Sequence, residues 1–466
     1  MTEYDLLVIG GGPGGLGAAI EAASLGGRVA VAESGPLGGA CLNWGCIPTK
    51  ALIHAAKVTQ TIRTAGHFGI DIGTPRPEWP AVVSRIRHVV ADLQHEPAEL
   101  ARLGITRLAG TARFGSDKQV LVRTADGEQT VTAAAVIIAT GARPIVPRIP
   151  GLTACQPIHA WQLLQLNRAP ARLAIIGGGP EGVEFAQACQ RLGITVTLVE
   201  QTSRLCGREE GEFSQELAER LMDEGVDVRL GSTVHRAEAT LTGKALYLDS
   251  EARHPVEVDL ILLAAGSRPN TADLDLGRAG IAHTASGITV DAQLRTSVPH
   301  VYAIGDVIGP PMLAHKADYD GIVAARNAVG HAQMRANHKL VPRVTFSDPE
   351  LASVGLTEAE ASSRGYGVAV GRCRFADIGK AQAIGETLGG VKIVVDAATR
   401  HILGVHIFGA QADVLINEAV LAMRYCRSVG ALSEVATMHA SPTLSQALTR
   451  AADDVDDVDT IVGYAA

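Results

Sequence analysis

The sequence has few cysteines and lacks both long apolar runs and blocks of basic residues. Its seven cysteines are an odd number and mostly scattered over 466 residues, unlike the disulfide framework of a small secreted protein. No apolar run approaches the roughly 18 residues that a membrane span needs. The formal net charge of −8 provides no general field that would attract nucleic acid or an anionic membrane. We therefore expect neither as a partner.

The N-terminal residues lead directly into an apolar strand, without the basic region and cleavage site of a signal peptide. Together with the scattered cysteines, this predicts a cytoplasmic protein. A chain of 466 residues, 47% of them apolar, is too long for one hydrophobic core and can fill several. We expect a globular protein of roughly two to four domains.

One pattern of strand, glycine turn, helix, strand and acidic residue occurs twice. The first copy, within residues 4–33, contains Gly10, Gly12, Gly15 and Glu33. The second copy, within residues 173–200, contains Gly177, Gly179, Gly182 and Glu200, and the first glycine precedes the acid by 23 residues in both copies. Such glycines let N–H groups at a helix N-terminus approach a pyrophosphate, and the acid accepts hydrogen bonds from ribose hydroxyls. The chain therefore carries two predicted dinucleotide-binding units.

Each unit is followed by a similar second element, an apolar strand that ends in a turn. These elements cover residues 136–144 and 261–269. The proline-rich stretch 144–150 then predicts a linker, because prolines stiffen the chain and end regular structure. We place a domain boundary near residue 150.

The glycine pattern is absent beyond about residue 340. Alternating apolar residues predict strands at 391–395 and 402–408, followed by a helical stretch over 412–425. We expect a separate C-terminal α+β domain.

Cys41 and Cys46 are the two cysteines that lie close together in the sequence. In a straight α-helix such an i, i+5 pair would lie about 8 to 9 Å apart at Cα, beyond the roughly 7 Å that a disulfide tolerates. A bond between them requires a distorted backbone, which Gly45 permits. Pro48 is typical of a first helical turn, where the helix dipole and Lys50 would favour a Cys46 thiolate. The pattern favours a labile, redox-active pair, with two independent buried thiols as the alternative.

Longer motifs extend this interpretation over essentially the whole chain. They are the runs 41–50 (C-L-N-W-G-C-I-P-T-K), 139–141 (A-T-G), 303–306 (A-I-G-D), 312–316 (M-L-A-H-K), 341–344 (V-P-R-V), 349–350 (P-E) and 353–358 (S-V-G-L-T-E). With these motifs the chain resembles the pyridine nucleotide-disulfide oxidoreductases, and among them the dihydrolipoamide dehydrogenases most closely.

The resemblance implies an α/β fold with two Rossmann-like dinucleotide-binding domains, one for FAD and one for NAD, and a C-terminal α+β dimerisation domain. The boundaries that we expect are 1–149 for the FAD-binding domain, 150–272 for the NAD-binding domain, 273–341 for a central domain that returns to the FAD domain, and 342–466 for the dimer-interface domain. It also implies a homodimer and a lipoyl-domain protein as a partner. The five remaining cysteines lack metal-ligand spacing, so we expect no metal site.

The resemblance further implies the site residues. Those for FAD are Gly10, Gly12, Pro13, Gly14, Gly15, Glu33, Gly39, Lys50, Thr140, Gly141, Gly305, Asp306, Met312, Leu313 and Ala314. Those for NAD are Gly177, Gly179, Gly182, Glu184, Glu200 and Gly266. Cys46 corresponds to the thiol that faces the flavin and Cys41 to the thiol that exchanges with the substrate. Lys50 corresponds to the lysine near the flavin N5 edge, and Glu184 to the glutamate that pairs with it and meets the nicotinamide.

The acid at the end of the second repeat bears on the choice between NAD and NADP. The Glu200 carboxylate would accept from the adenosine ribose and repel a 2′-phosphate, which favours NAD. Arg204 lies four residues later and would offset that repulsion if it faced the nucleotide. A single loop arginine is more often a solvated surface residue.

The C-terminal run departs from the family at two positions. Dihydrolipoamide dehydrogenases have a His-Ala-His-Pro-Thr-x-x-Glu-like run, whose histidine before proline takes the substrate thiol's proton and whose glutamate orients it. Residues 439–446 read H-A-S-P-T-L-S-Q, so Ser441 occupies the base position and Gln446 the glutamate position. A serine hydroxyl does not titrate near neutral pH, and loss of such a base typically costs on the order of 10²- to 10⁴-fold in rate. His439, two positions upstream, replaces the base only if the loop is shifted.

Three functions therefore stay open. The first is a dihydrolipoamide dehydrogenase-like enzyme whose activity on standard lipoamide is weak, or whose bound partner supplies the base. The second is an NADH-dependent reductase of quinones, metal ions or another small disulfide, which needs no thiol deprotonation. The third is a catalytically silenced flavoprotein subunit, against which the intact Cys41/Cys46 pair argues. The sequence has no vicinal cysteine pair at its C-terminus, so mercury reduction is not expected.

Overall fold

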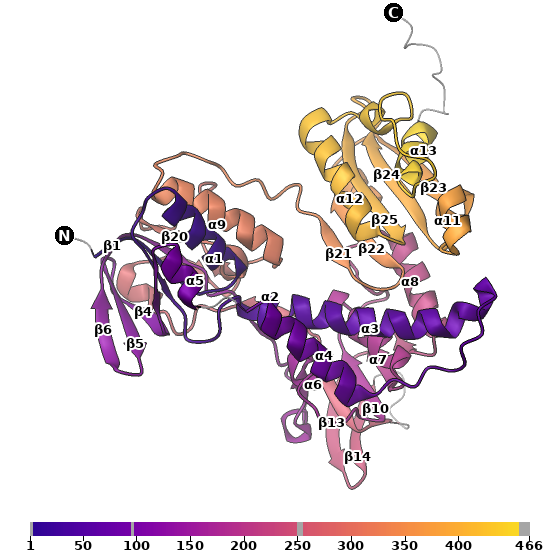
Figure 1. Ribbon diagram of the computed structural model, residues 1–466, viewed down its shortest axis with the longest axis horizontal. Coiled ribbons are helices and arrows are strands. Elements are labelled where there is room, and N and C mark those ends of the chain that lie inside the picture. The colour runs from indigo at the N-terminus through magenta and orange to yellow at the C-terminus, as the bar shows by residue number, and fades with distance from the viewer. Residues whose placement is uncertain (1–2, 95–96, 249–254, 456–466) are drawn as a thin grey trace, which may run out of the picture. The chain divides into compact units, whose positions relative to one another are not determined.

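The computed structural model describes residues 3–94, 97–248 and 255–455, and these fall into two compact units (Figure 1). The first unit combines three segments of the chain, 1–51, 80–147 and 265–338. The second combines 52–79, 148–264 and 339–466. Among the described helices, none has the length and apolar character of a membrane-crossing segment.

The first unit is built on a parallel sheet with the strand order β20-β7-β1-β2-β3. Its strands are β1 (Tyr4–Ile9), β2 (Val29–Ala32), β3 (Ile105–Leu108), β7 (Ala133–Ile138) and β20 (Val301–Ala303). Leu6, Leu7 and Val8 are all fully buried, so both faces of β1 are covered, as a parallel sheet requires. The apolar strands predicted around Gly10 and before Ala139 are thereby confirmed.

Different elements cover the two faces of this sheet. On one face α1 (Pro13–Ser24) packs against α9 (Ala314–Ala328), as Figure 1 shows. A Cβ on Gly321 would lie 2.3 Å from the Gly14 carbonyl oxygen, so glycine is needed for this close helix contact. On the other face the antiparallel strands β4 (Gly110–Ser116), β5 (Gln119–Thr124) and β6 (Gly127–Val131) contribute a small apolar cluster.

The remaining elements of the first unit are short. They are α2 (Gly39–Asn43), α5 (Pro97–Arg102), β8 (Ala142–Pro144), β17 (Ser267–Pro269), η4 (Leu276–Ala279), β18 (His283–Thr284), β19 (Gly287–Ile288) and η5 (Gly305–Ile308). The helices α3 (Cys46–Thr64) and α4 (Trp79–Asp92) each span a boundary between the two units. Strands β8 and β17 pair with each other, so the two predicted turns after the repeated strands form one hairpin-like ladder.

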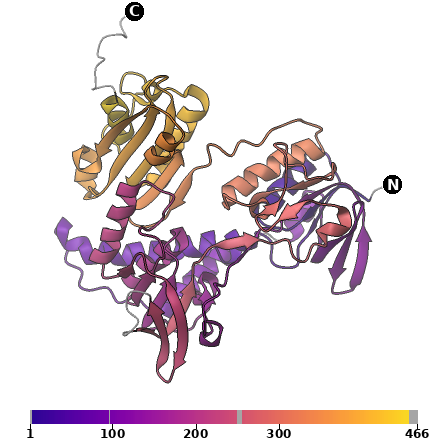
Figure 2. The same cartoon turned by 180° about the vertical axis from the view of Figure 1, so that it is seen from behind.

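The second unit contains another parallel sheet, in the order β12-β11-β10-β16-β9. Its strands are β9 (Ile158–His159), β10 (Arg172–Ile176), β11 (Thr195–Val199), β12 (Asp227–Arg229) and β16 (Leu260–Leu263). Associated elements are η1 (Ala65–Phe68), η2 (Thr153–Cys155), α6 (Ala160–Leu163), α7 (Pro180–Arg191) and α8 (Gly211–Asp223). Strands β13 (Val234–Thr240), β14 (Gly243–Leu248) and β15 (Val256–Val258) form an antiparallel ribbon, also visible in Figure 2.

An antiparallel sheet in the order β21-β22-β25-β24-β23 follows in the C-terminal part of the second unit. Its strands are β21 (Arg343–Thr345), β22 (Glu350–Gly355), β23 (Val368–Arg374), β24 (Gly390–Asp396) and β25 (Ile402–Gly409). Helical elements are α10 (Glu358–Ser363), η6 (Phe375–Asp377), α11 (Gly379–Ile384), α12 (Ala412–Leu421), the π-helix η7 (Ala422–Cys426), η8 (Val429–Leu432) and α13 (Gln446–Asp454). Two parallel α/β layers and a C-terminal α+β layer confirm the predicted fold class.

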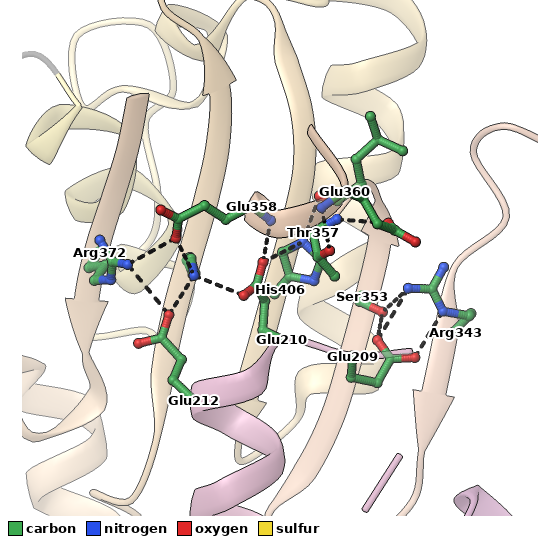
Figure 3. Close-up of polar contacts among 12 residues, drawn as sticks. Glu209, Glu210, Glu212, Arg343, Ser353, Thr357, Glu358, Glu360, Arg372 and His406 are labelled. Atoms are coloured by element: carbon green, nitrogen blue, oxygen red, sulfur yellow. Dashed lines mark hydrogen bonds and ion pairs between the residues drawn. The ribbon is translucent and has the colours of Figure 1, made fainter. Parts of the chain in front are cut away.

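A buried charge cluster joins α8 to the C-terminal sheet, and we call it the junction cluster (Figure 3). The Lys392 side chain on β24 is only 4% exposed. Its Nζ lies 2.8 Å from Glu210, 2.7 Å from Glu212 and 2.8 Å from Glu358. Burial raises the pKa of Glu210, but the hydrogen bonds from Lys392 and the Glu358 N–H, together with His406, outweigh it, and the pKa lies below its ordinary value. In the junction cluster, the three carboxylates therefore share one buried ammonium group, which stabilises their charged forms.

Lys392→Met should lower the free energy of unfolding of the second unit by about 3 kcal/mol, because it leaves the buried Glu210 carboxylate without its nearest cation. Urea unfolding followed by circular dichroism measures this loss. Glu216→Gln is the matched control, since it breaks a more exposed pair between α8 and β23, with Arg374 2.7 Å from Glu216. It should cost less than about 1 kcal/mol. Equal losses in the two variants would contradict the prediction.

Candidate functional sites

The two predicted glycine turns have the same backbone geometry. Gly10 has φ +111° and Gly177 has φ +115°, conformations that favour glycine. Each turn leads into a helix whose first residue is proline, Pro13 in α1 and Pro180 in α7. Pro lacks an N–H, so at a first helical position it costs no intrahelical hydrogen bond. The following N–H groups stay available to a ligand at each helix N-terminus.

Close backbone contact explains the third glycine of each motif. A Cβ on Gly15 would lie 1.9 Å from the Gly10 carbonyl oxygen, and a Cβ on Gly182 would lie 1.8 Å from that of Gly177. No side chain fits there without moving the turn away from the helix. The glycines therefore fix how each helix N-terminus faces its turn.

The acids of the two repeats hold the glycine turns. Glu33 accepts from the Gly11 N–H at 2.7 Å and from the Gly35 N–H at 2.6 Å. Glu200 accepts from the Gly178 N–H at 2.6 Å and from the Thr202 N–H at 2.7 Å. The Thr202 hydroxyl also donates to Glu200 Oε1 at 2.8 Å, but Glu200 Oε2 and both Glu33 oxygens keep a lone pair for a ribose hydroxyl.

Among the hydrogen bonds of the described residues, none joins the Arg204 guanidinium to Glu200. Its Nη2 donates instead to the Gly207 carbonyl oxygen, 3.0 Å away in the same loop. The side chain is exposed, as expected of a solvated surface arginine.

A cavity of about 610 Å³ lies in the first unit, beside the first glycine turn. The predicted FAD residues that line it are Gly10, Gly12, Pro13, Gly14, Glu33, Gly39, Thr140, Gly141, Gly305, Asp306, Met312 and Ala314. Both cysteines of the pair also line it. Gly15, Lys50 and Leu313 are not among the lining residues. The cavity thus brings together segments that lie hundreds of residues apart in the sequence.

The wall of this cavity is suited to a dinucleotide. A Cβ on Gly39 would lie 2.7 Å from Gly12 Cα, and one on Gly10 would lie 2.3 Å from the Ala139 carbonyl oxygen. The wall is therefore bare backbone next to a helix N-terminus, which favours a diphosphate. Asp306 also lines the cavity, and burial raises its pKa while Lys316 opposes that shift. An aspartate there can hydrogen-bond ligand hydroxyls.

Sequence reasoning missed several parts of the cavity. Residues 110–112 at the start of β4, and Asn270, Asp273 and Leu274 after β17, also line it. The Thr140 hydroxyl donates to the Asn270 carbonyl oxygen at 2.8 Å, which links the two lining segments that carry these residues. No local spacing indicates such a contact, because Thr140 and Asn270 are 130 positions apart in the sequence.

A buried ion pair supports the turn that carries Asp306. Lys316 Nζ lies 2.9 Å from Asp320, whose carboxylate also accepts from the Gly305 N–H at 3.2 Å. His338 lies 2.6 Å from the other oxygen of Asp320. Lys316 belongs to the sequence motif 312–316. Through its ion pair with Asp320, it stabilises the turn at Gly305.

The helical conformation is interrupted between the two cysteines. Helix α2 ends at Asn43 and α3 begins at Cys46, which confirms the prediction that Cys46 starts a helix. The Gly45 N–H donates to the Ala40 carbonyl oxygen at 2.6 Å, and a Cβ on Gly45 would lie 2.9 Å from that oxygen. The glycine thus permits the sharp break that shortens the i, i+5 separation.

Cys41 and Cys46 are free thiols in the structure, and both are partly buried. Their hydrogen bond raises the pKa of Cys41, burial adds to the shift, and Lys50 opposes it. Such a shift requires the two side chains to lie side by side, and it favours the neutral form of Cys41. The two thiols therefore lie next to each other at the cavity.

The predicted NAD residues surround the N-terminal half of α7, apart from Gly266, which belongs to the first unit. Glu184 is 5% exposed and accepts from the Phe346 N–H at 2.8 Å. Gly266 follows β16 with φ +87°. Glu184 is thus anchored by the strand connection that follows β21.

The C-terminal loop differs from the sequence expectation in its partners. Ser441 is exposed, and Gln446 is the first residue of α13. His439 Nε2 lies 2.8 Å from Glu418 on α12, a pair that sequence reasoning missed because 21 residues separate its members. The loop therefore contains an imidazole–carboxylate pair, two positions before the serine. Within the described ranges, no group of His, Cys, Asp and Glu is arranged to hold a metal ion.

Comparison with known proteins gives consistent matches over nearly the whole chain. Residues 4–321 match the model of the pyridine nucleotide-disulphide oxidoreductase family, and residues 341–452 match its dimerisation domain. The chain is 38% identical to a dihydrolipoyl dehydrogenase of Chlorobaculum tepidum and 40% identical to one of Thermus scotoductus, over 97% of each chain. The HOCl-induced flavoprotein disulfide reductase RclA from Escherichia coli matches with a TM-score of 0.86 and 29% identity, over 98% of this chain and 100% of that one.

Paired glycine substitutions should separate the two dinucleotide sites. Gly15→Ala should weaken dinucleotide binding in the first unit at least about tenfold, because the methyl group meets the Gly10 carbonyl. Gly182→Ala should do the same in the second unit only. Flavin absorbance of the purified protein reports the first site, and NADH fluorescence titration reports the second.

Gly277→Ala and Gly207→Ala serve as controls in the two units, because a Cβ at either position meets no atom within 4 Å. Loss of both ligands in either glycine-motif variant would mean that the substitution disturbs the whole fold, contrary to the prediction.

Proposed function

The chain belongs to the pyridine nucleotide-disulphide oxidoreductase family, and from this premise we propose that it transfers electrons between NAD(H) and a lipoyl-type dithiol or disulfide through the Cys41/Cys46 pair. It is an NAD-dependent flavoprotein oxidoreductase that uses FAD, close to the dihydrolipoyl dehydrogenases. The observation that carries the proposal is the proximity of the two thiols, both of which line the dinucleotide-sized cavity.

In this proposal the first glycine turn binds FAD, with Glu33 toward the ribose and Asp306 toward ligand hydroxyls. The second turn binds NAD, with Glu200 toward its adenosine ribose. When bound, FAD supplies two-electron chemistry between a hydride donor or acceptor and a dithiol. Lys50 and Glu184 hold charge next to the reacting groups, which is the role that family members give to the matching positions.

The cysteine pair exchanges with the substrate in two steps. A substrate thiolate attacks Cys41 Sγ of the oxidised pair, the Cys41–Cys46 bond breaks, and Cys46 leaves as a thiolate at the N-terminus of α3. The second substrate thiol then displaces Cys41, which takes up that thiol's proton. The neighbouring Cys46 and burial both raise the pKa of Cys41, which favours a neutral Cys41 thiol in the reduced pair.

The matched dimerisation domain supports a homodimer as the proposed quaternary arrangement. The domain boundaries in the proposal are those expected from the sequence, with 1–149 and 273–341 serving FAD, 150–272 serving NAD, and 342–466 forming the interface of a homodimer. A lipoyl-domain protein is the proposed partner. Residence in the cytoplasm stays a prediction from the sequence.

Ser441 and Gln446 favour a second candidate function, the reduction by NADH of acceptors that need no thiol deprotonation, such as quinones. An imidazole paired with a carboxylate can accept a proton near neutral pH, whereas a serine hydroxyl cannot. His439, held by Glu418, is the residue that would serve the thiol substrate if the loop presents it. The two functions thus differ in whether a base other than Ser441 works in this loop.

Oxidation of NADH should be measured with a lipoyl-protein, free lipoamide and a quinone as acceptors. The proposal expects turnover of the lipoyl substrates, and Cys46→Ser should lower it at least about 100-fold, since serine cannot re-form the disulfide. Fast quinone reduction that survives Cys46→Ser, with lipoyl substrates at background, would favour the second function. No acceptor reduced by the wild type would favour a silenced subunit.

Restoring the family residues tests the C-terminal loop. Ser441→His combined with Gln446→Glu should raise lipoamide turnover at least about tenfold, because it supplies an oriented base. The ratio of kcat/KM for lipoamide in variant and wild type is the measurement. His439→Gln is the control, and it lowers the wild-type rate only if His439 already serves as the base. An unchanged rate in the double variant would show that this loop does not meet the substrate.

A further inference from the structure

Helix α7 presents three buried polar side chains on one face. Glu184, Gln187 and Arg191 follow an i, i+3, i+7 spacing, and they are 5%, 3% and 2% exposed. Buried polar groups of this kind need hydrogen-bond partners, because burial without them costs free energy. The face therefore has to dock on a polar segment.

All three side chains bond to the short connection between β21 and β22. Glu184 accepts from the Phe346 N–H at 2.8 Å. Gln187 accepts from the Asp348 N–H at 2.7 Å and donates to the Asp348 carbonyl oxygen at 2.8 Å. Arg191 Nη1 donates to the Asp348 carboxylate at 2.6 Å. One connection of the C-terminal part thus sets the position of the helix that carries Glu184.

The Asp348 carboxylate bridges two helices. Its Oδ2 receives Arg191 from α7, and its Oδ1 lies 3.1 Å from Lys57 Nζ of α3. The side chains of Arg191 and Asp348 are 2% and 14% exposed, so this contact is poorly screened by water. Without the carboxylate, two cations from two helices would face the same site and repel each other.

The local charges agree with this bridge. Burial alone would raise the pKa of Asp348, but Arg191 and Lys57 outweigh it, and the pKa lies below its ordinary value. Burial lowers the pKa of Lys57, but Asp348, with smaller contributions from Glu386 and Glu350, outweighs it, and the pKa lies above its ordinary value. Glu224 pairs with the other side of Arg191 at 2.7 Å, so Arg191 stays charged whether or not Asp348 does.

Lys57 also connects Asp348 to the redox pair through α3. It lies 11 residues after Cys46 and 7 after Lys50 in one continuous helix. At about 100° per residue these intervals bring all three positions to nearly the same face. A constraint on Lys57 therefore constrains the direction of the helix that begins at Cys46.

We propose that Asp348 is a positioning residue that holds α7, with Glu184, and α3, with Lys57, in one fixed arrangement, and that its charge is required for hydride transfer from NADH. The inference rests on the proposed function, in which Glu184 meets the nicotinamide. Asp348 touches neither cofactor nor substrate in this role. It acts through the two helices that it joins.

Asp348→Asn tests the bridge with little change of shape. Its backbone can still pair with Gln187, but an amide has one acceptor oxygen and can retain only one of the two cations. Reduction of the bound flavin by NADH, followed by stopped flow as the loss of flavin absorbance, should slow about tenfold. The KM for NADH should stay within about threefold, and reduction of the cysteine pair by dithiothreitol within about twofold.

A second readout needs no cofactor. In flavin-free protein, hydrogen–deuterium exchange should speed up at least about threefold in peptides covering residues 180–191 and 52–64 of Asp348→Asn. Lys57→Gln removes one arm of the bridge at a more exposed position, with a side chain that is 41% exposed. It should slow flavin reduction about threefold and loosen α3 alone. If Asp348→Asn does not fold, the results for Lys57→Gln decide whether the bridge positions α3.

Glu210→Gln is the matched control, because it weakens the junction cluster of Figure 3 without touching α7 or α3. It should leave flavin reduction unchanged. Equal slowing in Glu210→Gln would mean that general fastening of the C-terminal part is what matters, and it would overturn the inference, as would wild-type rates and exchange in Asp348→Asn. If wild-type flavin is not reduced by NADH, the proposed function fails, and the exchange experiment still decides the role of Asp348.

Discussion

The contact between a glycine of the helix and the carbonyl of the preceding turn is the constraint on which both nucleotide sites depend. A Cβ on Gly15 or Gly182 would lie within 1.9 Å of a carbonyl oxygen, so the helix can approach its turn only if that position has no side chain. This approach leaves the N–H groups of the first helical turn facing outward next to bare backbone. The acids Glu33 and Glu200 then hold the turns by accepting from their N–H groups.

Sequence periodicity predicted the features that local physics determines. Alternating and continuous apolar runs predicted the strands, the repeated glycine spacing predicted the starts of α1 and α7, and Pro48 predicted that α3 starts at Cys46. The contacts that it missed join distant residues through buried polar groups. The pairs His439–Glu418 and Arg191–Asp348 separate by 21 and 157 residues, and no period of a strand or helix relates such positions. Only tertiary packing determines them.

The departures from the family lie at one place in an otherwise complete set of motifs. The two glycine turns are suited to dinucleotides, and the cysteine pair lines the cavity beside the first turn. In the proposed function, Ser441 and Gln446 would alter only the group that moves a proton on the thiol substrate. Electron transfer and proton transfer would then depend on different segments of the chain, so that one could change in evolution without the other.

Each unit is assembled from three separate stretches of the chain, and the boundary at residues 51 and 52 falls inside α3. No single cut of the gene yields either unit whole. Recombination at the N-terminal or middle boundaries would sever a helix or leave a sheet without its edge strands, whereas the stretch from residue 339 onward can be exchanged as one block. That block carries Asp348, His439 and Ser441, so a single exchange would replace the Asp348 bridge together with the loop that contains His439 and Ser441.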